Sequence, residues 1–275
     1  MTADSFGNTL DVDGVRVSCR WVGPGPAEAP TIVMLHEGLG CLELWHDFPD
    51  RLAQATGCGV FAYSRPGYGA SDPVALPRPL TYMEDEARGM LPKLLDAIGY
   101  QRGVLLGHSD GASIAAIYAG SVEDHRVRGL VLYAPHFFAE DVGLKSIVAA
   151  KQAYEAGDLK PRLAKYHGDN VECAFRGWSD AWLAPGFRDW NILEFVTYIR
   201  VPILIMQGAD DQYGTLEQLR AAEEEAYSPV ETVVLEDCGH APQSDQPERT
   251  IDETARFIAH VMGDQSSTGT SGSAG

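Results

Sequence analysis

A serine between two glycines is the residue pattern that points most directly to chemistry. Residues 107–111 read GHSDG; they end an apolar run and precede the helix-like stretch ASIAAIYA. A Gly-x-Ser-x-Gly turn between a strand and a helix is typical of a nucleophile elbow. It places Ser109 at a helix N-terminus, where free N–H groups and the helix dipole favour a developing anion. We therefore predict that Ser109 is a nucleophile.

A serine hydroxyl needs a base that takes its proton, and His240 fits that role. It lies in residues 238–242 (CGHAP), directly after the last apolar run of the chain. This position puts His240 on a loop at the carboxyl end of a strand, the same sheet edge as Ser109. We predict His240 as the base and expect His36 and His108 to brace loops.

The base in turn needs an acid that fixes its tautomer and stabilises the imidazolium. The apolar run 202–208 ends in glycine and is followed by Asp210 and Asp211, and either carboxylate could reach His240. The chain order Ser, Asp, His is the order expected when these three groups act on such a fold.

The elements that position these residues can be predicted from apolar runs. Unbroken runs rich in Val, Ile and Leu suit strands that are buried on both faces. Their alternation with helix-like stretches predicts an α/β fold with a doubly wound, mostly parallel sheet. The expected strands are 15–21, 31–35, 59–63, 103–107, 129–134, 202–208 and 231–236, and the expected helices 43–55, 81–98, 110–120, 215–227 and 247–262.

Residues 135–198 interrupt this alternation with helix formers and three of the five tryptophans. A structureless loop of that length is improbable, so we predict a helical lid inserted into the core. The core then comprises residues 1–134 and 199–263. Residues 264–275 are rich in Gly, Ser and Thr, and we expect a flexible tail.

Charge and cysteine content exclude several classes of function. The formal net charge is −18, which disfavours nucleic acid and anionic membranes as partners. The five cysteines are scattered, without metal-ligand spacing, which favours reduced thiols in a cytoplasmic protein. The first residues lack the features of a signal peptide, and no apolar run could span a bilayer. We expect a small-molecule substrate and no cofactor or metal; the oligomeric state stays open.

Together these motifs give a specific resemblance. From about residue 10 to 262 the chain resembles a lid-bearing serine hydrolase of the α/β-hydrolase fold, similar to esterases, amino-acid ester hydrolases and meta-cleavage C–C hydrolases. The motifs that carry it are residues 36–40 (HEGLG), 64–71 (SRPGYGAS), 107–111 (GHSDG), 208–211 (GADD) and 239–240 (GH).

The resemblance assigns further roles to single residues. In the family the acid falls three residues after the strand-ending glycine, which favours Asp211 over Asp210. The oxyanion hole uses the N–H group of the residue after the nucleophile, here Asp110, and one from the loop after the first parallel strand, here Gly38.

Two carboxylates depart from the usual family pattern. Glu37 stands where a glycine is common, and Asp110 directly follows the serine; a third departure is Ser64 in place of an aspartate. Glu37 and Asp110 either brace their loops or bind an ammonium group of the substrate, because similar hydrolases of amino-acid esters carry Asp after the serine. Trp178 and Trp182 either form the core of the lid or line the substrate pocket.

The sequence therefore predicts a serine hydrolase that acts on a small ester, possibly an amino-acid ester, an amide, or a ketone-activated C–C bond. The alternative is a non-hydrolytic protein of the same fold, a lyase or a ligand receptor. Ser109 argues against the aspartate nucleophile of dehalogenase and epoxide hydrolase relatives. Neither repeats nor charge runs support an interaction module.

Overall fold

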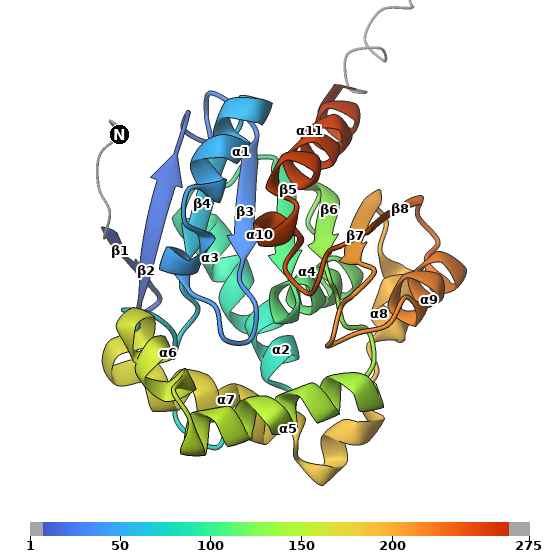
Figure 1. Cartoon of the computed structure of the whole chain (residues 1–275). Helices are drawn as coiled ribbons and strands as arrows, with labels where there is room; N and C mark the ends of the chain where they lie inside the picture. The colour runs from blue at the N-terminus through green and yellow to red at the C-terminus, as the bar shows by residue number, and fades with distance from the viewer. Residues whose placement is uncertain (1–7, 264–275) are drawn as a thin grey trace, which may run out of the picture.

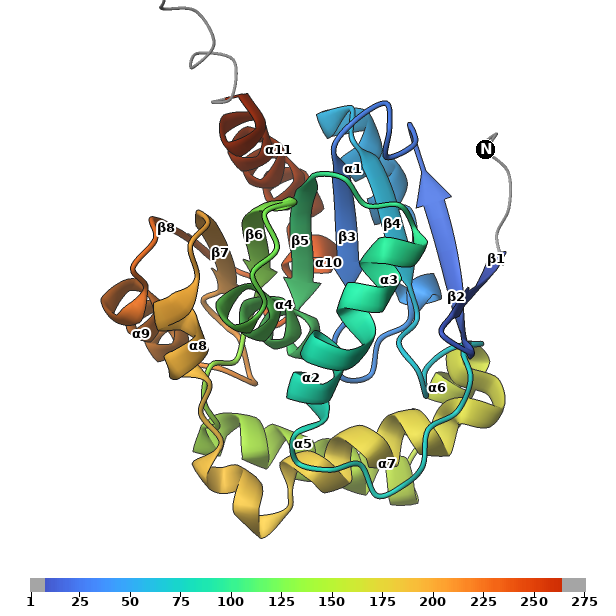
Figure 2. The same cartoon turned by 180° about the vertical axis from the view of Figure 1, so that it is seen from behind.

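The computed structural model describes residues 8–263, which form one mixed sheet with helices on both faces (Figures 1 and 2). The strand order is β1-β2-β4-β3-β5-β6-β7-β8. The pairs β1–β2 and β2–β4 are antiparallel, and all later pairs are parallel. The strands are β1 (Asn8–Val12), β2 (Val15–Val22), β3 (Thr31–Leu35), β4 (Gly59–Tyr63), β5 (Gly103–His108), β6 (Val127–Tyr133), β7 (Ile203–Gly208) and β8 (Val230–Leu235).

The central strands have no solvent-exposed side because helices cover both faces of the sheet. Every residue of β3, β4, β5 and β7 is buried. This explains why the sequence shows unbroken apolar runs there rather than the alternation of a half-exposed strand. Because these strands run parallel, their carboxyl ends meet at one edge of the sheet. The loops that follow β3, β5, β6 and β7 lie at this edge.

One face of the sheet is covered by α1 (Phe48–Thr56) and α11 (Pro247–Gly263), which pack against each other. Helix α4 (Asp110–Ser121) lies on the other face and packs on β5 and β6 (Figure 2). The remaining core helices are η1 (Leu42–Trp45), α2 (Tyr82–Asp85), the π-helical η2 (Glu86–Met90), α3 (Leu91–Ala97), α9 (Glu217–Glu225) and α10 (Pro242–Asp245).

A helical insertion separates β6 from β7. It contains α5 (Asp141–Ala156), α6 (Leu159–His167), η3 (Gly168–Asn170), α7 (Val171–Trp182), η4 (Pro185–Asp189) and α8 (Leu193–Tyr198). Helices α5, α6 and α7 lie across the carboxyl ends of the parallel strands in both views, whereas α8 packs against α4 and α9 (Figures 1 and 2). The first three helices therefore cover the sheet edge that carries the predicted site residues.

The predicted fold class is confirmed, and the strands agree with the apolar runs to within about two residues. The helix expected over 81–98 is divided into α2, η2 and α3, and the one expected over 43–55 into η1 and α1. All five cysteines are buried and free. Within residues 8–263 no helix is both long and apolar enough to cross a bilayer. The tail expected over 264–275 lies outside the described residues.

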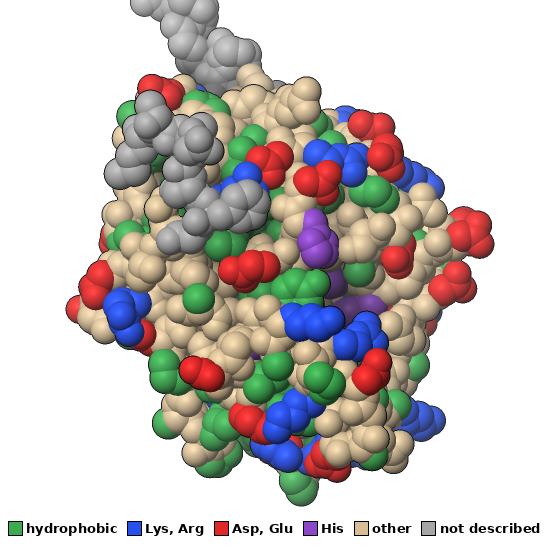
Figure 3. All heavy atoms as spheres, turned by 60° about the vertical axis from the view of Figure 1, so that its left-hand side comes forward, with side chains coloured by type: hydrophobic (Ala, Val, Ile, Leu, Met, Phe, Trp, Pro, Cys, Tyr) green, Lys and Arg blue, Asp and Glu red, His purple; other side chains and the backbone are tan. Residues whose placement is uncertain are grey.

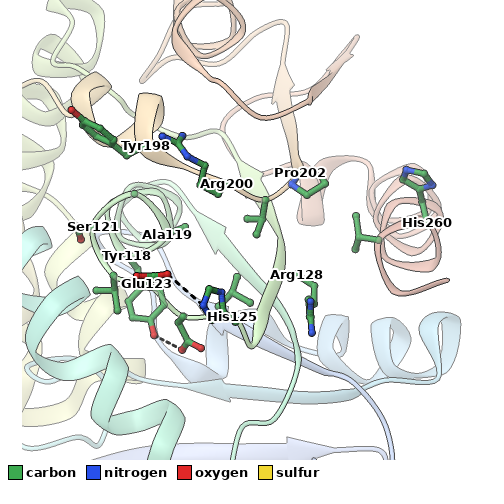
Figure 4. Close-up of a pocket in the computed structure, with 16 residues that line it drawn as sticks. Tyr118, Ala119, Ser121, Glu123, His125, Arg128, Tyr198, Arg200, Pro202 and His260 are labelled. Carbon is green, nitrogen blue, oxygen red and sulfur yellow. Dashed lines mark hydrogen bonds and ion pairs between the residues drawn. The ribbon is translucent and has the colours of Figure 1, made fainter. Parts of the chain in front are cut away.

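One wide hollow lies far from the predicted site residues. It has a volume of about 630 Å³ and lies between the end of α4 and the start of β6 and β7, with Arg128, Arg200, His125 and His260 around it (Figure 4). This is the amino-terminal edge of the strands, opposite Ser109. On the face that Figure 3 shows, acidic and basic side chains are interspersed, without a patch of one sign.

Two glycine substitutions test the packing of helix α4. A Cβ atom at Gly120 would lie 2.1 Å from the backbone oxygen of Phe195 in α8, whereas one at Gly89 meets no atom within 4 Å. Alanine removes backbone freedom from the unfolded chain and favours a helix by up to ~1 kcal/mol. Overpacking outweighs that gain at Gly120, by about 1–3 kcal/mol.

We therefore expect Gly120→Ala to lower the free energy of unfolding and Gly89→Ala to leave it equal or higher. Urea denaturation of both variants beside the parent chain measures the difference. Equal effects of the two substitutions would contradict the close contact between α4 and α8.

Candidate active site

The turn between β5 and α4 holds Ser109 in a strained backbone conformation, with φ 53° and ψ −118°. A non-glycine residue adopts this region only when its surroundings enforce it. Here the flanking glycines allow strand and helix to approach: a Cβ at Gly107 would lie 2.3 Å from the oxygen of Gly111. The Ser109 N–H donates to the oxygen of Tyr133 in β6 over 2.9 Å, which anchors the turn to the sheet.

His240 and Asp211 form a hydrogen-bonded pair at the same edge of the sheet. The imidazole Nδ1 of His240 lies 2.9 Å from both carboxylate oxygens of Asp211. Asp210, in contrast, points into solvent. The structure therefore places the carboxylate of Asp211, not that of Asp210, on the ring of His240.

Further donors hold the carboxylate of Asp211 in position. The Tyr213 N–H donates to its Oδ1 over 2.8 Å, and the side-chain amide of Gln207 to its Oδ2 over 3.3 Å. Burial raises the pKa of Asp211, but the hydrogen bond and charge of His240 outweigh this, so the net pKa lies below its usual value. Asp211 is thus ionised at neutral pH and fixes the proton of His240 on Nδ1, which leaves Nε2 as the basic nitrogen.

Ser109 and His240 line one small cavity of about 90 Å³. No hydrogen bond joins the Ser109 hydroxyl to the His240 ring among the residues described. The other residues of the lining are Glu37, Gly38, Leu39, Asp110, His136, Gly143, Ile147, Trp178, Trp182 and Tyr213. All eight site residues expected from the sequence therefore meet at this cavity or, for Asp211, directly behind it.

The backbone N–H groups of Gly38 and Asp110 are free to bind an anion. Neither donates a hydrogen bond to another described residue, although both residues are part of the cavity lining. Buried N–H groups without a partner are rare in folded proteins. Gly38 cannot carry a side chain, because its Cβ would lie 2.3 Å from the indole ring of Trp178.

A family model described as the alpha/beta hydrolase family matches residues 32–253. The chain belongs to the α/β hydrolase family. The fold, the predicted resemblance and the hydrolase class agree with this assignment.

Curated relatives of this α/β hydrolase are distant. It is 30% identical to epoxide hydrolase 2 of Siraitia grosvenorii over 139 residues, which are 50% of this chain and 42% of that protein. It is 27% identical to the dihydrolipoyllysine-residue acetyltransferase component of the acetoin cleaving system of Cupriavidus necator, over 92% of this chain and 68% of that protein. The chain thus spans less than half the length of the epoxide hydrolase.

Solved structures share the fold at low sequence identity. An esterase from Exiguobacterium antarcticum superimposes with a TM-score of 0.72 at 22% identity, covering 92% of this chain and 99% of that one. Such a likeness establishes the architecture, and the chemistry has to be argued from the site.

A buried arginine holds the loop of this α/β hydrolase that carries Gly38. The Arg65 guanidinium, fully buried, donates from Nη2 to the oxygens of His36 and Glu37 over 3.2 and 3.0 Å. The Arg65 N–H donates to His36 Nε2 over 2.9 Å, and His36 Nδ1–H donates to the oxygen of Glu37 over 2.7 Å. His36 therefore braces the loop, and its pKa is lowered by burial first and by the charge of Arg65 second.

Glu37 pairs with a second buried histidine. Its Oε2 lies 3.3 Å from Nδ1 of His108, whose Nε2–H donates to the backbone oxygen of His240 over 2.7 Å. Burial raises the pKa of Glu37, but the hydrogen bond and charge of His108 hold it at about 2. Burial lowers the pKa of His108, and Glu37 more than reverses this. The pair links the Gly38 loop to the His240 loop.

The carboxylate of Asp110 turns into a buried network of this hydrolase. Its Oδ2 accepts a hydrogen bond of 2.5 Å from the hydroxyl of Tyr82, and Arg65 Nη2 lies 3.9 Å away. The Oδ1 atom is buried without a partner within the described chain. Burial raises the pKa of Asp110, and the positive charge of Arg65 opposes that rise.

The two tryptophans come from helix α7 of the insertion and have different contacts. Trp178 lies on Gly38, and Trp182 donates from its indole N–H to the hydroxyl of Tyr82 over 3.0 Å. From α6, His167 donates from Nε2 to the oxygen of Leu39 over 3.0 Å and accepts the N–H of Gly69 on Nδ1. The insertion of this hydrolase therefore contacts the loop that carries Gly38 directly.

Sequence reasoning missed several residues of the site. No sequence pattern singled out His136, yet this side chain lies in the cavity lining beside His240. Sequence reasoning also gave Tyr82, Arg65 and His167 no place near Ser109. Among the described residues no cluster of potential ligands could hold a metal ion.

The Glu37–His108 pair predicts a specific pH dependence of stability. A carboxyl group whose pKa falls from an ordinary 4.5 to about 2 on folding stabilises the folded state fully above pH ~4.5 and loses this contribution as the pH falls toward 2. The parent chain should therefore lose stability relative to Glu37→Gln over this interval, measured by urea denaturation in steps of pH.

The control is Glu123→Gln, because the Glu123 side chain is 87% exposed. Its difference from the parent should stay nearly constant between pH 4.5 and 2, since an exposed ion pair contributes little. A constant difference for Glu37→Gln as well would show that His108 does not stabilise the Glu37 carboxylate.

Proposed function

We propose that this α/β hydrolase cleaves small carboxylic esters with Ser109 as the nucleophile, His240 as the base and Asp211 as the acid that orients it. The observation that carries the proposal is the meeting of a strained serine, a His–Asp pair and two free N–H groups at one cavity. Each group alone has a structural explanation. Their convergence from loops after β3, β5, β7 and β8 is what acyl transfer requires.

The proposed reaction runs in two halves. His240 Nε2 takes the proton of Ser109 while the serine oxygen attacks the ester carbonyl carbon. The N–H groups of Gly38 and Asp110 donate to the oxyanion of the tetrahedral intermediate, each contributing ~3 kcal/mol. The C–O bond to the alcohol then breaks, the alcohol leaves with the proton from His240, and water hydrolyses the acyl-serine by the same route.

Two alternatives fit the site less well. Epoxide hydrolase chemistry needs an aspartate at the nucleophile position, which Ser109 occupies. Binding alone, as in a ligand receptor, does not require the Asp211–His240 hydrogen bond of 2.9 Å. A lyase would keep the same three residues, and an amide or a ketone-activated C–C bond could also be attacked, so turnover of matched substrates is the measurement that separates them.

The size of the cavity limits the substrate. Its volume of about 90 Å³ is far below the ~300–1,000 Å³ of a pocket for a drug-sized ligand. We infer a short acyl group, with residues 135–198 as a lid whose helices α5 and α7 supply Gly143, Ile147, Trp178 and Trp182 to the lining.

The two neighbouring aspartates provide a matched test of the triad. Asp211→Asn should lower kcat for p-nitrophenyl acetate by about 10⁴-fold, because the asparagine amide favours the wrong tautomer of His240. Asp210→Asn removes the same charge one residue away and should retain most of the activity. The opposite order would overturn the assignment of Asp211.

Ser109→Ala should abolish labelling by a fluorophosphonate probe, which reacts with activated serines, and lower kcat by about 10⁶-fold. The double variant with Ser109→Ala and Asp211→Asn should have a kcat only slightly below that of Ser109→Ala, because the residues act as a unit. Labelling of the parent chain at another serine, or none at all, would exclude the proposed nucleophile.

The carboxylate of Asp110 favours a substrate that carries an ammonium group. Its Oδ1 has no partner within the described chain but is enclosed, so Asp110, whose residue is part of the cavity lining, acts on a substrate through its charge rather than by direct contact. A charge pair ~4 Å apart is worth about 4 kcal/mol at an effective dielectric constant of ~20, before desolvation. Arg65, 3.9 Å from Oδ2, offsets part of this attraction, so the net preference is smaller.

We therefore expect alanine methyl ester to have a kcat/KM about 5- to 30-fold above that of methyl propionate, the matching ester without the amine. Asp110→Asn keeps the backbone N–H and should reduce this ratio toward one, mainly by slowing the cationic ester. Steady-state kinetics on both esters, with Asp210→Asn as the control, measure it. Equal kcat/KM values for the two esters in the parent chain would show that Asp110 has only a structural role.

A further inference from the structure

His136 is a histidine of the cavity that the proposed triad does not use. It follows β6, and its backbone oxygen accepts the hydroxyl hydrogen bond of Ser113 over 2.6 Å. The side chain is only 5% exposed and lines the cavity together with Ser109 and His240. Its ring lies 5.5 Å from the ring of His240, at 30° to it, and meets the edge of Trp182 at 5.2 Å.

The ring nitrogens of His136 have hydrogen-bonding capacity that the protein leaves unused. They make no hydrogen bond within residues 8–263, although the ring is almost completely enclosed. Neither nitrogen is among the fully enclosed, unpaired side-chain atoms of the described residues, so a small partner can reach them. A ligand that encloses them must supply that partner, because an unpaired buried polar atom costs free energy. An occupant of the cavity can supply the missing partner.

His136 is uncharged at neutral pH. Burial first, and the positive charge of His240 second, lower its pKa to about 3. A neutral imidazole offers one N–H donor and one acceptor nitrogen, and a hydroxyl group can pair with either. The carboxylates of Glu37, Asp110 and Asp211 around the cavity disfavour an anionic group at the same place.

The position of His136 beside His240 indicates which part of the substrate it contacts. In the proposed reaction His240 gives its proton to the leaving oxygen, so the alcohol part of the ester must lie against His240. The ring of His136 packs on the ring of His240 and therefore lies next to that part. The acyl part instead lies over Ser109 and the two N–H groups.

We propose that His136 determines specificity for the alcohol: the enzyme prefers monoesters of diols and polyols, whose free hydroxyl group binds the His136 ring. This inference rests on the proposed ester hydrolysis and adds the class of leaving group. An alkyl alcohol of the same size leaves the buried imidazole unpaired and is disfavoured. The reaction balances as before: the acyl–oxygen bond breaks, and the diol leaves with the proton from His240.

Two acetates of nearly equal size test the proposal. 2-Hydroxyethyl acetate and propyl acetate differ only by a terminal hydroxyl in place of a methyl group. We expect the parent chain to favour the hydroxyethyl ester by about 10- to 100-fold in kcat/KM, the size expected when a buried polar group gains or loses its partner. A ratio near one in the parent chain would overturn the proposal.

Substitutions of His136 assign the preference to its ring. His136→Phe keeps an aromatic ring against Trp182 but removes both nitrogens, and should bring the ratio close to one. His136→Gln keeps a donor and an acceptor and should retain part of the preference. His125→Phe, at a side chain that is 87% exposed, is the matched control and should leave rates and ratio unchanged.

The ratio of kcat/KM for the two esters distinguishes a role of His136 in specificity from a role in positioning His240. If His136→Phe slows both esters equally and preserves the ratio, His136 acts only on His240, and the proposal is wrong. Fluorophosphonate labelling of Ser109 tests the proposed ester hydrolysis separately from the role of His136. Normal labelling without preference between the alcohols contradicts only the role of His136, whereas absence of labelling and of turnover contradicts ester hydrolysis itself.

Acyl transfer in the reverse direction gives an independent measurement. Acetyl-enzyme formed from p-nitrophenyl acetate can transfer its acetyl group to an added alcohol instead of water. Ethane-1,2-diol should be a better acceptor than propan-1-ol by a factor similar to the ester ratio, because both directions share one transition state. Equal partitioning to the two alcohols would overturn the proposal even if the substituted proteins fold poorly.

Discussion

Strand β5 and helix α4 approach so closely at Gly107 and Gly111 that no side chain fits between them. A Cβ at Gly111 would lie 2.1 Å from the oxygen of Leu35, the last residue of β3. These two backbone contacts impose the strained turn at Ser109 and bring the loop after β3 beside it. These contacts bring the serine and the loop that carries Gly38 side by side, and buried side chains then hold that loop in place.

A second constraint is the buried charge of Arg65. Its Nε and Nη1 atoms have no hydrogen-bond partner within the described residues, while Nη2 donates to two loop oxygens. Enclosing an incompletely paired guanidinium costs free energy of folding. We therefore interpret Arg65 as a residue that positions the loop rather than one that stabilises the fold. Arg65, His36 and the Glu37–His108 pair together fix the path of the loop that presents Gly38. The cavity can consequently offer two unpaired N–H groups without collapsing around them.

Local sequence patterns and the family resemblance predicted the fold and the eight expected site residues that the structure brings to the cavity or directly behind it, but they predicted neither His136 nor the role of Tyr82. Apolar runs marked the strands, and glycine spacing marked the turns. The spacing of the residues did not decide whether Asp210 or Asp211 pairs with His240. The family resemblance favoured Asp211, which is the one that the structure places on His240. His136 gave no comparable signal, because its place depends on the register of β6 beside β5 and on Trp182, 46 residues further along the chain. The Tyr82–Asp110 contact likewise joins residues 28 positions apart, which no periodicity reveals.

The aromatic lining of the cavity gives the protein an internal optical reporter. Two of its five tryptophans, Trp178 and Trp182, belong to the cavity lining, and Trp190 packs against Trp182 with ring centres 5.5 Å apart. Indole emission responds to nearby polar groups and to exclusion of water, and His136 lies edge-on to Trp182. Occupancy of the cavity is therefore coupled to the intrinsic fluorescence of the unmodified chain, and movement of α7 over Gly38 is coupled to the same signal. Binding of a ligand in the cavity can thus be followed in real time without any attached dye.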